Sequence, residues 1–220
     1  RVLFRSYTYA SIVGGQTANT EFELLTGNTL GFLSAGTTAF QLYIHGQMPS
    51  LVSNLKAEGY SGNKAMHPFN PYNYNRPAVY KDFGFTDFID KFDFPKNVKR
   101  VREYISDEAN VDRIISEYEK NRKKTDQPFY MYNMTIQNHS PYDKDAANFK
   151  QPIKIESSKY DAEANRYLNL IKYSDDSLKQ LTSYFEKCKE PTIILFLGDH
   201  QPRLTDEFMN KIPNGQYQTW

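Results

Sequence analysis

The chain has 220 residues, enough for one large domain with a substantial core and too few for two ordinary domains joined by a linker. Its 27 basic residues against 26 acidic ones give a formal net charge of +1, so no overall electrostatic field favours nucleic acid or an anionic membrane surface. Aromatic residues make up 15% of a composition typical of a globular protein, and no apolar run approaches the roughly 20 residues that cross a bilayer. We therefore expect the segment itself to be soluble.

The first part of the chain is predicted to contain short elements. The strands are weak candidates, and both helices are followed by glycines that stop them. In chain order they are a strand at residues 7–13, a helix at residues 20–25 before Gly27, a helix at residues 50–58 before Gly59, and a strand at residues 64–66. Residues 68–95 are rich in Asn, Pro, Tyr, Phe and Asp, and we expect a long surface loop with short elements there.

The second part of the chain alternates longer helices with strands. Residues 107–124 repeat apolar side chains at helical spacing, and Asp107 can cap the start of that helix. Residues 161–187 form the longest predicted helix, with a single apolar stripe. Short apolar runs predict buried strands at residues 129–135 and 192–197. This alternation predicts an α/β domain with a mostly parallel sheet sandwiched between helices.

An unusual polar cluster follows each of the four predicted strands. Parallel strands end at the same edge of a sheet, and ligands bind beyond that edge, so we expect the clusters to form one site. Three of the four histidines of the chain lie in them. The clusters are Gly14-Gly15-Gln16-Thr17, His67-Pro68-Phe69, Gln137-Asn138-His139-Ser140-Pro141-Tyr142 and Gly198-Asp199-His200.

The last cluster offers ligands for a divalent metal ion. Asp199 and His200 are adjacent where a predicted strand ends, and a carboxylate with an imidazole suits Mn²⁺, Mg²⁺ or Zn²⁺. For this pair alone, an aspartate that caps a turn beside a structural histidine is an equally good interpretation.

Thr17 is the candidate nucleophile. Its hydroxyl is predicted at a helix N-terminus, where the helix dipole and free N–H groups favour an alkoxide and a bound phosphate or sulfate. A metal or a base must lower its pKa before it reacts. In isolation, a plain N-cap is the more common role of a threonine at such a position.

Two histidines and an arginine are candidates for binding the substrate. His67 precedes an aromatic, Asn-rich stretch that contains Tyr74 and Arg76, and a guanidinium is well shaped for a phosphate-like group. His67 or His139 can bind a substrate oxygen or protonate a leaving group. For each histidine alone, a hydrogen-bonded structural role is at least as common.

One histidine and the cysteine lie outside the four polar clusters. His45 and Cys188, the single cysteine, are both interpreted as structural. Disulfides are therefore absent, which does not decide the compartment of the protein.

Taken together and in order, five motifs resemble those of the lipoteichoic acid synthase group, phosphoglycerol transferases of the alkaline phosphatase and sulfatase superfamily. The resemblance extends from about residue 9 to about residue 202. Its motifs here are Gly15-Gln16-Thr17-Ala18-Asn19-Thr20-Glu21-Phe22, Met66-His67-Pro68 with Asn75-Arg76, Asn138-His139-Ser140-Pro141-Tyr142, Tyr173-Ser174-Asp175, and Gly198-Asp199-His200.

The resemblance implies a covalent mechanism with a metal ion, preferably Mn²⁺. Thr17 is then both the nucleophile and a metal ligand, and Asp199 and His200 are the other metal ligands present. Thr17 attacks the phosphorus of a lipid head group, that of phosphatidylglycerol, and forms a glycerophosphoryl-threonine. A glycolipid or a growing polymer is the implied acceptor.

The resemblance also implies a substrate pocket. His67, Arg76 and His139 line the glycerophosphate site, with His139 the better candidate for proton transfer. Tyr74 stands where the family often has a tryptophan shortly before the arginine, so an aromatic ring is retained.

The chain departs from the family at its two ends. Relatives have a glutamate at the end of a first strand that completes the metal site, membrane-spanning helices before the domain, and further sheet after the Asp-His motif. We therefore expect residues 1–220 to be a single partial catalytic domain of a membrane-anchored enzyme that acts on the extracytoplasmic face of the bacterial cell membrane. Weak metal affinity and little activity are expected of these residues alone.

Three other functions are alternatives to phosphoglycerol transfer. Phosphoethanolamine transfer also uses a threonine, although the Asn-His-Ser-Pro-Tyr cluster fits the phosphoglycerol group better. Sulfate ester hydrolysis usually needs a cysteine or serine at the nucleophile position, so Thr17 disfavours it. A non-catalytic surface domain has no need for Thr17, Asp199 and His200 together, and the missing glutamate leaves it as an alternative.

Overall fold

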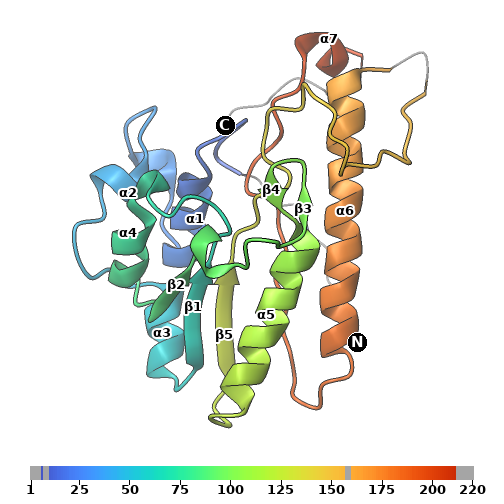
Figure 1. The fold of residues 1–220 in the computed structure, drawn as a ribbon. Coiled ribbons are helices and arrows are strands. Elements are labelled where there is room, and N and C mark those ends of the chain that lie inside the picture. The colour runs from blue at the N-terminus through green and yellow to red at the C-terminus, as the bar shows by residue number, and fades with distance from the viewer. Residues whose placement is uncertain (1–5, 7–9, 157–159, 212–220) are drawn as a thin grey trace.

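The core of the protein is a three-stranded parallel sheet, seen in a computed structural model that describes residues 6, 10–156 and 160–211 (Figure 1). The strand order is β2-β1-β5. The strands are β1 (Ser61–Met66), β2 (Asp87–Ile89) and β5 (Phe129–Asn133). In register, Met66 pairs with both Ile89 and Asn133, so the three strands end together at one edge. We call it the carboxyl edge.

Helices cover both faces of this sheet. On one face α5 (Asp107–Arg122) packs against β1 and β5, and α6 (Ala162–Phe185) packs on the outside of α5 (Figure 1). The other face is covered by α1 (Thr17–Thr26), α2 (Ala39–Leu42), α3 (Leu51–Ala57) and α4 (Arg76–Asp82). The expected α/β fold, a parallel sheet sandwiched between helices, is confirmed.

Alternate side chains of each strand serve the two cores. Met66 and Met131 pack toward α5, while their neighbours Ala65 and Tyr132 pack toward α1 to α4. A small antiparallel hairpin of β3 (Arg100–Val101) and β4 (Tyr104–Ile105) leads into α5. The short elements that complete the fold are η1 (Leu30–Phe32), η2 (Asn73–Asn75), η3 (Lys91–Asp93) and α7 (Asp206–Met209).

The helix predictions are confirmed, with one error at a cap. α3 begins after Ser50, whose hydroxyl accepts from the backbone N–H of Ser53, and α6 begins after its cap Asp161. The prediction that Asp107 caps α5 is wrong. Ser106 is the cap, because its hydroxyl accepts from the N–H of Ala109.

The prediction of a surface loop at residues 68–95 is wrong in part. This region contains α4 and β2, and its side chains Val79, Tyr80 and Phe83 are almost fully buried. The helix has only 7 residues, too few for a periodic pattern to stand out from the surrounding Asn and Pro residues. Its aromatic side chains fill the core against the sheet.

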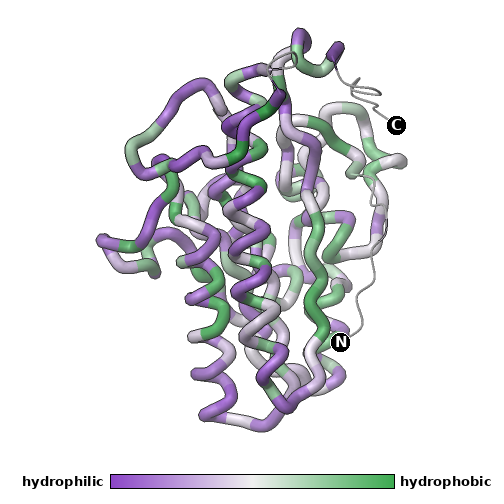
Figure 2. The backbone as a smooth tube through the Cα atoms, turned by 90° about the vertical axis from the view of Figure 1, so that its right-hand side faces the viewer, coloured by the Kyte–Doolittle hydropathy of each residue, from purple (hydrophilic) through white to green (hydrophobic). Residues whose placement is uncertain are grey.

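The prediction of a strand at residues 192–197 is also wrong. These residues form no ladder, and Ile193 is 96% and Leu195 70% exposed. The stretch is the straight green segment of Figure 2 that follows α6. An apolar run becomes a strand only where a neighbour pairs with its backbone, and within the described ranges no strand does so.

The other strand predictions have mixed outcomes. β5 is two residues shorter than predicted, and β1 begins three residues earlier. Of the strand predicted at residues 7–13, residues 7–9 lie outside the described part. Val13 forms an isolated parallel bridge with Gln201. Among the described helices, none combines the length and hydropathy that crossing a membrane requires.

Candidate active site

Thr17 lies in the first turn of α1, directly after a tight turn. Gly14 has a φ of +72°, and a Cβ there would lie 3.1 Å from the Cβ of Arg203, so only glycine fits this turn easily. Gln16 then occupies the N-cap in a left-handed conformation, with a φ of +61°. Since Gln16 is the N-cap residue, the interpretation of Thr17 as a plain N-cap is wrong. Its hydroxyl instead donates to Oδ2 of Asp199 at 2.8 Å.

Asp199 and His200 meet Thr17 from the far end of the chain. Nε2 of His200 lies 3.3 Å from the same Oδ2 of Asp199. Nδ1 of His200 lies 2.8 Å from the carbonyl oxygen of Gln201. Because a carbonyl can only accept, Nδ1 donates to it, and Nε2 is the ring nitrogen that faces the Asp199 carboxylate. The loop is tied to α1 by Thr20, whose hydroxyl donates to the Asp199 carbonyl at 2.6 Å.

This arrangement fits a divalent cation. Nε2 of His200 faces a carboxylate oxygen at 3.3 Å, an arrangement that a shared proton or a bound cation makes favourable. A hydroxyl, a carboxylate and an imidazole are oxygen and nitrogen ligands suited to Mn²⁺, Mg²⁺ or Zn²⁺, and the carbonyl bond at Nδ1 is typical of metal-binding histidines. Within the described part of the chain, no group of three or more His, Cys, Asp or Glu side chains is placed to hold a metal ion.

His67 directly follows β1 at the carboxyl edge. Its backbone N–H donates to the carbonyl of Ile89, and Nδ1 lies 3.1 Å from the carbonyl oxygen of Met134. Burial lowers the pKa of His67 to about 3, with the positive charge of Arg76 as the next cause. The ring is therefore neutral at physiological pH, and Nε2 is its hydrogen-bond acceptor.

His139 lies in the loop that follows β5, with an exposed side chain. Its Nδ1 lies 2.6 Å from the carbonyl oxygen of Ser140, so here too Nε2 is the free nitrogen of the neutral ring. The ring of Phe69 lies between the two imidazoles, at 6.4 Å from His139 and 6.1 Å from His67 between centroids. The structure thus brings these two histidines to one place.

Arg76 is buried against helix α1. Its Nε and Nη2 donate to Oε1 of Glu21 at 3.1 and 2.6 Å, and the hydroxyl of Tyr80 donates to the other carboxylate oxygen. Arg76 and Glu21 are 2% and 0% exposed. The guanidinium also lies 5.1 Å from the centroid of the Tyr74 ring. The structure therefore places Arg76 in a buried ion pair, and a phosphate contact of Arg76 is still only predicted.

Glu21 and Phe69 are site residues whose roles are not evident from the sequence. Glu21 lies one helical turn after Thr17, among buried residues of α1 that are otherwise uncharged, and a charged residue in such a place was the available signal. Phe69 stood within the second cluster, yet nothing local to the sequence indicated that its ring would reach His139.

Electrostatic interactions connect these groups around the carboxyl edge. Tyr142, in the loop of His139, has a pKa raised chiefly by burial, and the negative charge of Asp199 contributes. The charges of Arg76 and His139 both act on His67. The four clusters lie near one another as expected, although only those of His67 and His139 follow strands of the sheet, and the chemical roles of the residues are still predictions.

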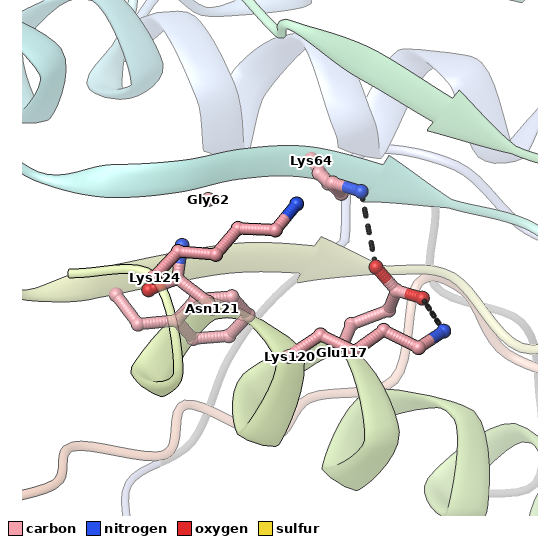
Figure 3. Close-up of a pocket in the computed structure, with 7 residues that line it drawn as sticks. Gly62, Lys64, Glu117, Lys120, Asn121 and Lys124 are labelled. Atoms are coloured by element: carbon pink, nitrogen blue, oxygen red, sulfur yellow. Dashed lines mark hydrogen bonds and ion pairs between the residues drawn. The ribbon is translucent and has the colours of Figure 1, made fainter.

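A hollow of about 240 Å³ lies away from these residues, between the C-terminal half of α5 and the beginnings of β1 and β5 (Figure 3). Lys64 and Lys120, which line it, each form an ion pair with Glu117 at 3.0 Å. Since it lies at the opposite ends of the strands, it does not belong to the candidate active site.

Comparison with known proteins identifies relatives of the whole chain. Residues 3–219 match the family described as Sulfatase. A Rhizobium meliloti protein named for cyclic beta-1,2-glucan modification is 38% identical over 194 residues, which are 87% of this chain and 29% of that protein. A lipoteichoic acid synthase-like protein of Bacillus subtilis, YvgJ, is 28% identical over 195 residues, 87% of this chain and 30% of that protein. The chain spans less than a third of these two relatives.

Solved structures share the fold. Streptococcus pyogenes phosphoglycerol transferase GacH, in complex with sn-glycerol-1-phosphate, superposes with a TM-score of 0.71 at 24% identity, over 94% of this chain and 55% of that one. The lipoteichoic acid synthase LtaP from Listeria monocytogenes superposes with a TM-score of 0.68 at 24% identity, over 81% of this chain and 42% of that one.

Proposed function

The chain belongs to the sulfatase family, and from that premise we propose that it is part of an enzyme that transfers a phosphoglycerol group from a lipid donor through a covalent intermediate on Thr17. One observation carries this proposal. The Thr17 hydroxyl, at the start of a helix, donates to Asp199 beside His200, which is the arrangement of an activated nucleophile next to a cation site. The relatives named as lipoteichoic acid synthases and as a phosphoglycerol transferase support the choice of transferred group.

The first half of the reaction transfers the group to the enzyme. Oγ1 of Thr17 attacks the phosphorus of phosphatidylglycerol, and its proton passes to Oδ2 of Asp199, to which it already points. The bond between phosphorus and the diacylglycerol oxygen breaks, and protonated His139 gives that oxygen a proton. Diacylglycerol and glycerophosphoryl-Thr17 are the products.

The second half transfers the group to an acceptor. An acceptor hydroxyl attacks the same phosphorus and loses its proton to His139, which is now neutral. The bond to Oγ1 of Thr17 breaks, and Asp199 returns the proton to it. Since a relative is named for modification of a cyclic glucan, a glycan hydroxyl is one acceptor class, besides a glycolipid or a growing polymer.

A divalent cation, with Mn²⁺ preferred, would be held by Thr17, Asp199 and His200. When bound, it supplies positive charge that lowers the pKa of a hydroxyl and stabilises developing negative charge on phosphoryl oxygens. The resemblance to the family implies one further ligand, a glutamate, that would complete the site.

The glycerol moiety is proposed to bind against His67 and His139, whose rings flank that of Phe69. Neutral His67 has an acceptor at Nε2, which suits a glycerol hydroxyl better than it suits a phosphate anion. Tyr74 and Arg76 lie on the side of α1 and contribute packing and positive charge. The whole protein is proposed to be anchored in the membrane, with residues 1–220 part of one catalytic domain on the extracytoplasmic face.

Intact-protein mass spectrometry with peptide mapping tests the proposal. The full-length protein is incubated with Mn²⁺ and phosphatidylglycerol, and a glycerophosphate adduct on Thr17 is expected. The matched control is Thr26→Ala, because Thr26 lies on the same helix and its hydroxyl makes only local hydrogen bonds, to the Phe22 carbonyl and from the Asn28 backbone N–H. If metal is bound and no adduct forms, the phosphoglycerol assignment is wrong. An adduct from phosphatidylethanolamine would then identify the other head group.

A further inference from the structure

The loop of residues 137–141, which carries His139, is held by one arginine of the β3–β4 hairpin. Nη2 of Arg102 donates to the carbonyl oxygens of Gln137 at 2.8 Å and of His139 at 2.7 Å. Nη1 of Arg102 donates to the carbonyl oxygen of Pro141 at 2.7 Å. One guanidinium therefore binds three carbonyls within five consecutive residues, which its planar fork of five N–H groups makes possible.

The backbone of Arg102 adopts an uncommon conformation. Its φ is +53°, a left-handed value that is uncommon for a residue with a long side chain. The Asn148 side chain donates to the Arg102 carbonyl at 3.0 Å and supports the turn. The guanidinium carbon lies 5.3 Å from the ring centroid of Tyr104 and 5.9 Å from that of Tyr142. These contacts orient the Arg102 side chain toward the loop of residues 137–141.

The other side of the loop is anchored in the interior. Asn138 donates to the hydroxyl of Ser174 at 2.8 Å, and Ser174 donates to Oδ2 of Asp107 at 2.5 Å. Gln137 accepts from the backbone N–H of Asp107 at 3.0 Å. Since the loop follows β5 and lies outside the sheet ladders, side-chain hydrogen bonds of this kind decide its conformation.

The hydrogen bonds of Arg102 hold the backbone on both sides of Ser140, whose carbonyl orients the His139 ring. Nδ1–H of His139 donates to the Ser140 carbonyl, and the carbonyls on either side of Ser140, those of His139 and Pro141, both accept from Arg102. Fixing both neighbours fixes the direction of the Ser140 carbonyl. That carbonyl holds the proton on Nδ1 and leaves Nε2 as the nitrogen that faces a substrate.

We propose that Arg102 is a positioning residue for His139, which sets the tautomer and orientation of its imidazole through the carbonyls of the loop. The part of this inference that concerns turnover rests on the proposed function, whereas the tautomer of His139 does not depend on it.

The test is a double-mutant cycle. Arg102→Asn removes the guanidinium and keeps a residue that tolerates the left-handed backbone. We expect the rate of glycerophosphoryl-Thr17 formation to fall about 10- to 100-fold, with KM for phosphatidylglycerol changed less than about threefold. In a His139→Ala background, the same change is expected to alter the rate by less than about twofold, because Arg102 then has no imidazole to position.

Arg100→Asn is the matched control, because Arg100 lies in the same hairpin and its Nη1 donates only locally, to the Glu103 carbonyl. Equal rates for the Arg102→Asn and Arg100→Asn variants would overturn the inference, as would equal losses from Arg102→Asn in both backgrounds. If Arg102→Asn loses its far-UV circular dichroism, Arg102→Lys, which keeps the charge without the fork, takes its place in the cycle.

Nitrogen-15 NMR of the histidine rings gives an independent readout. We expect a single Nδ1–H tautomer for neutral His139 in the wild type and in Arg100→Asn, and a mixture in Arg102→Asn. An unchanged tautomer in the latter variant refutes the positioning role. If the wild type forms no adduct, the proposed function fails, and the tautomer still decides the role of Arg102.

Discussion

At the scale of single residues, the proposed chemistry depends on the position of one hydroxyl. Thr17 lies within hydrogen-bond distance of a carboxylate that comes from 182 positions later in the chain. We expect Thr17→Ala to lower the transfer rate by at least on the order of 10³-fold, and Thr17→Ser, which keeps the hydroxyl, to retain the adduct. The rate of diacylglycerol release measures both. Turnover by Thr17→Ala at the wild-type rate would exclude the covalent route.

His67 makes a separate prediction about pH. Its folded pKa of about 3 lies below the ordinary 6.5, so below pH 6.5 the unfolded chain takes up a proton that the folded chain does not. The contribution of neutral His67 is therefore present above pH 6.5 and is lost as pH falls from 6.5 toward 3.

His67→Gln should remove this term, so the slope of unfolding free energy against pH falls by up to about 1.4 kcal/mol per pH unit in that window. Urea denaturation at several pH values gives the slope. His45→Gln, a change at an exposed histidine, should leave it as in the wild type. Equal slopes for the two variants would contradict the assignment.

At the scale of elements, Asp107 joins the start of α5 to α6 and to the loop of His139. Burial raises its pKa to about 6, and its Oδ1 is buried without a hydrogen-bond partner among the described residues. Between the ordinary value of 3.8 and 6 the folded chain binds more protons than the unfolded chain. The protonated carboxyl therefore stabilises the fold at low pH, and this contribution is lost as pH rises through 6.

Asp107→Asn should flatten the part of the curve of unfolding free energy against pH that Asp107 causes. Compared with the wild type at the same pH, the variant should therefore be relatively more stable at pH 8 than at pH 5. The matched control is Asp112→Asn, an exposed change on the same helix at a residue that also binds α6, through Gln180. Thermal unfolding at both pH values is the measurement. A wild-type curve for Asp107→Asn would show that Asp107 ionises without cost in the folded protein.

At the scale of the whole molecule, the pair of Arg76 and Glu21 joins α4 to α1 inside the core. Removing one partner leaves the other buried and unpaired, so Arg76→Met should lower the unfolding free energy by about 3–5 kcal/mol. The double variant Glu21→Leu with Arg76→Met should recover part of that loss, since an apolar pair fits the same space and only the Tyr80 hydroxyl loses its acceptor.

Chemical denaturation and transfer assays on the same proteins separate two roles for Arg76. If the double variant recovers both stability and activity, the arginine is structural. If it recovers stability alone, the predicted contact with the phosphate gains support. A single variant as stable as the wild type would mean that the buried pair contributes nothing.

By itself, the sequence determined the helices at residues 50–58, 107–124 and 161–187, the parallel α/β class and the polar residues that follow each strand. Periodicity, capping and strand-end chemistry act over a few residues, so they can be seen in the chain. Only the tertiary structure decided that residues 192–197 do not join the sheet, that Glu21 pairs with Arg76, and that Arg102 holds the loop of His139. Those outcomes depend on partners tens of residues away, and local patterns do not specify which distant backbone or side chain will be there.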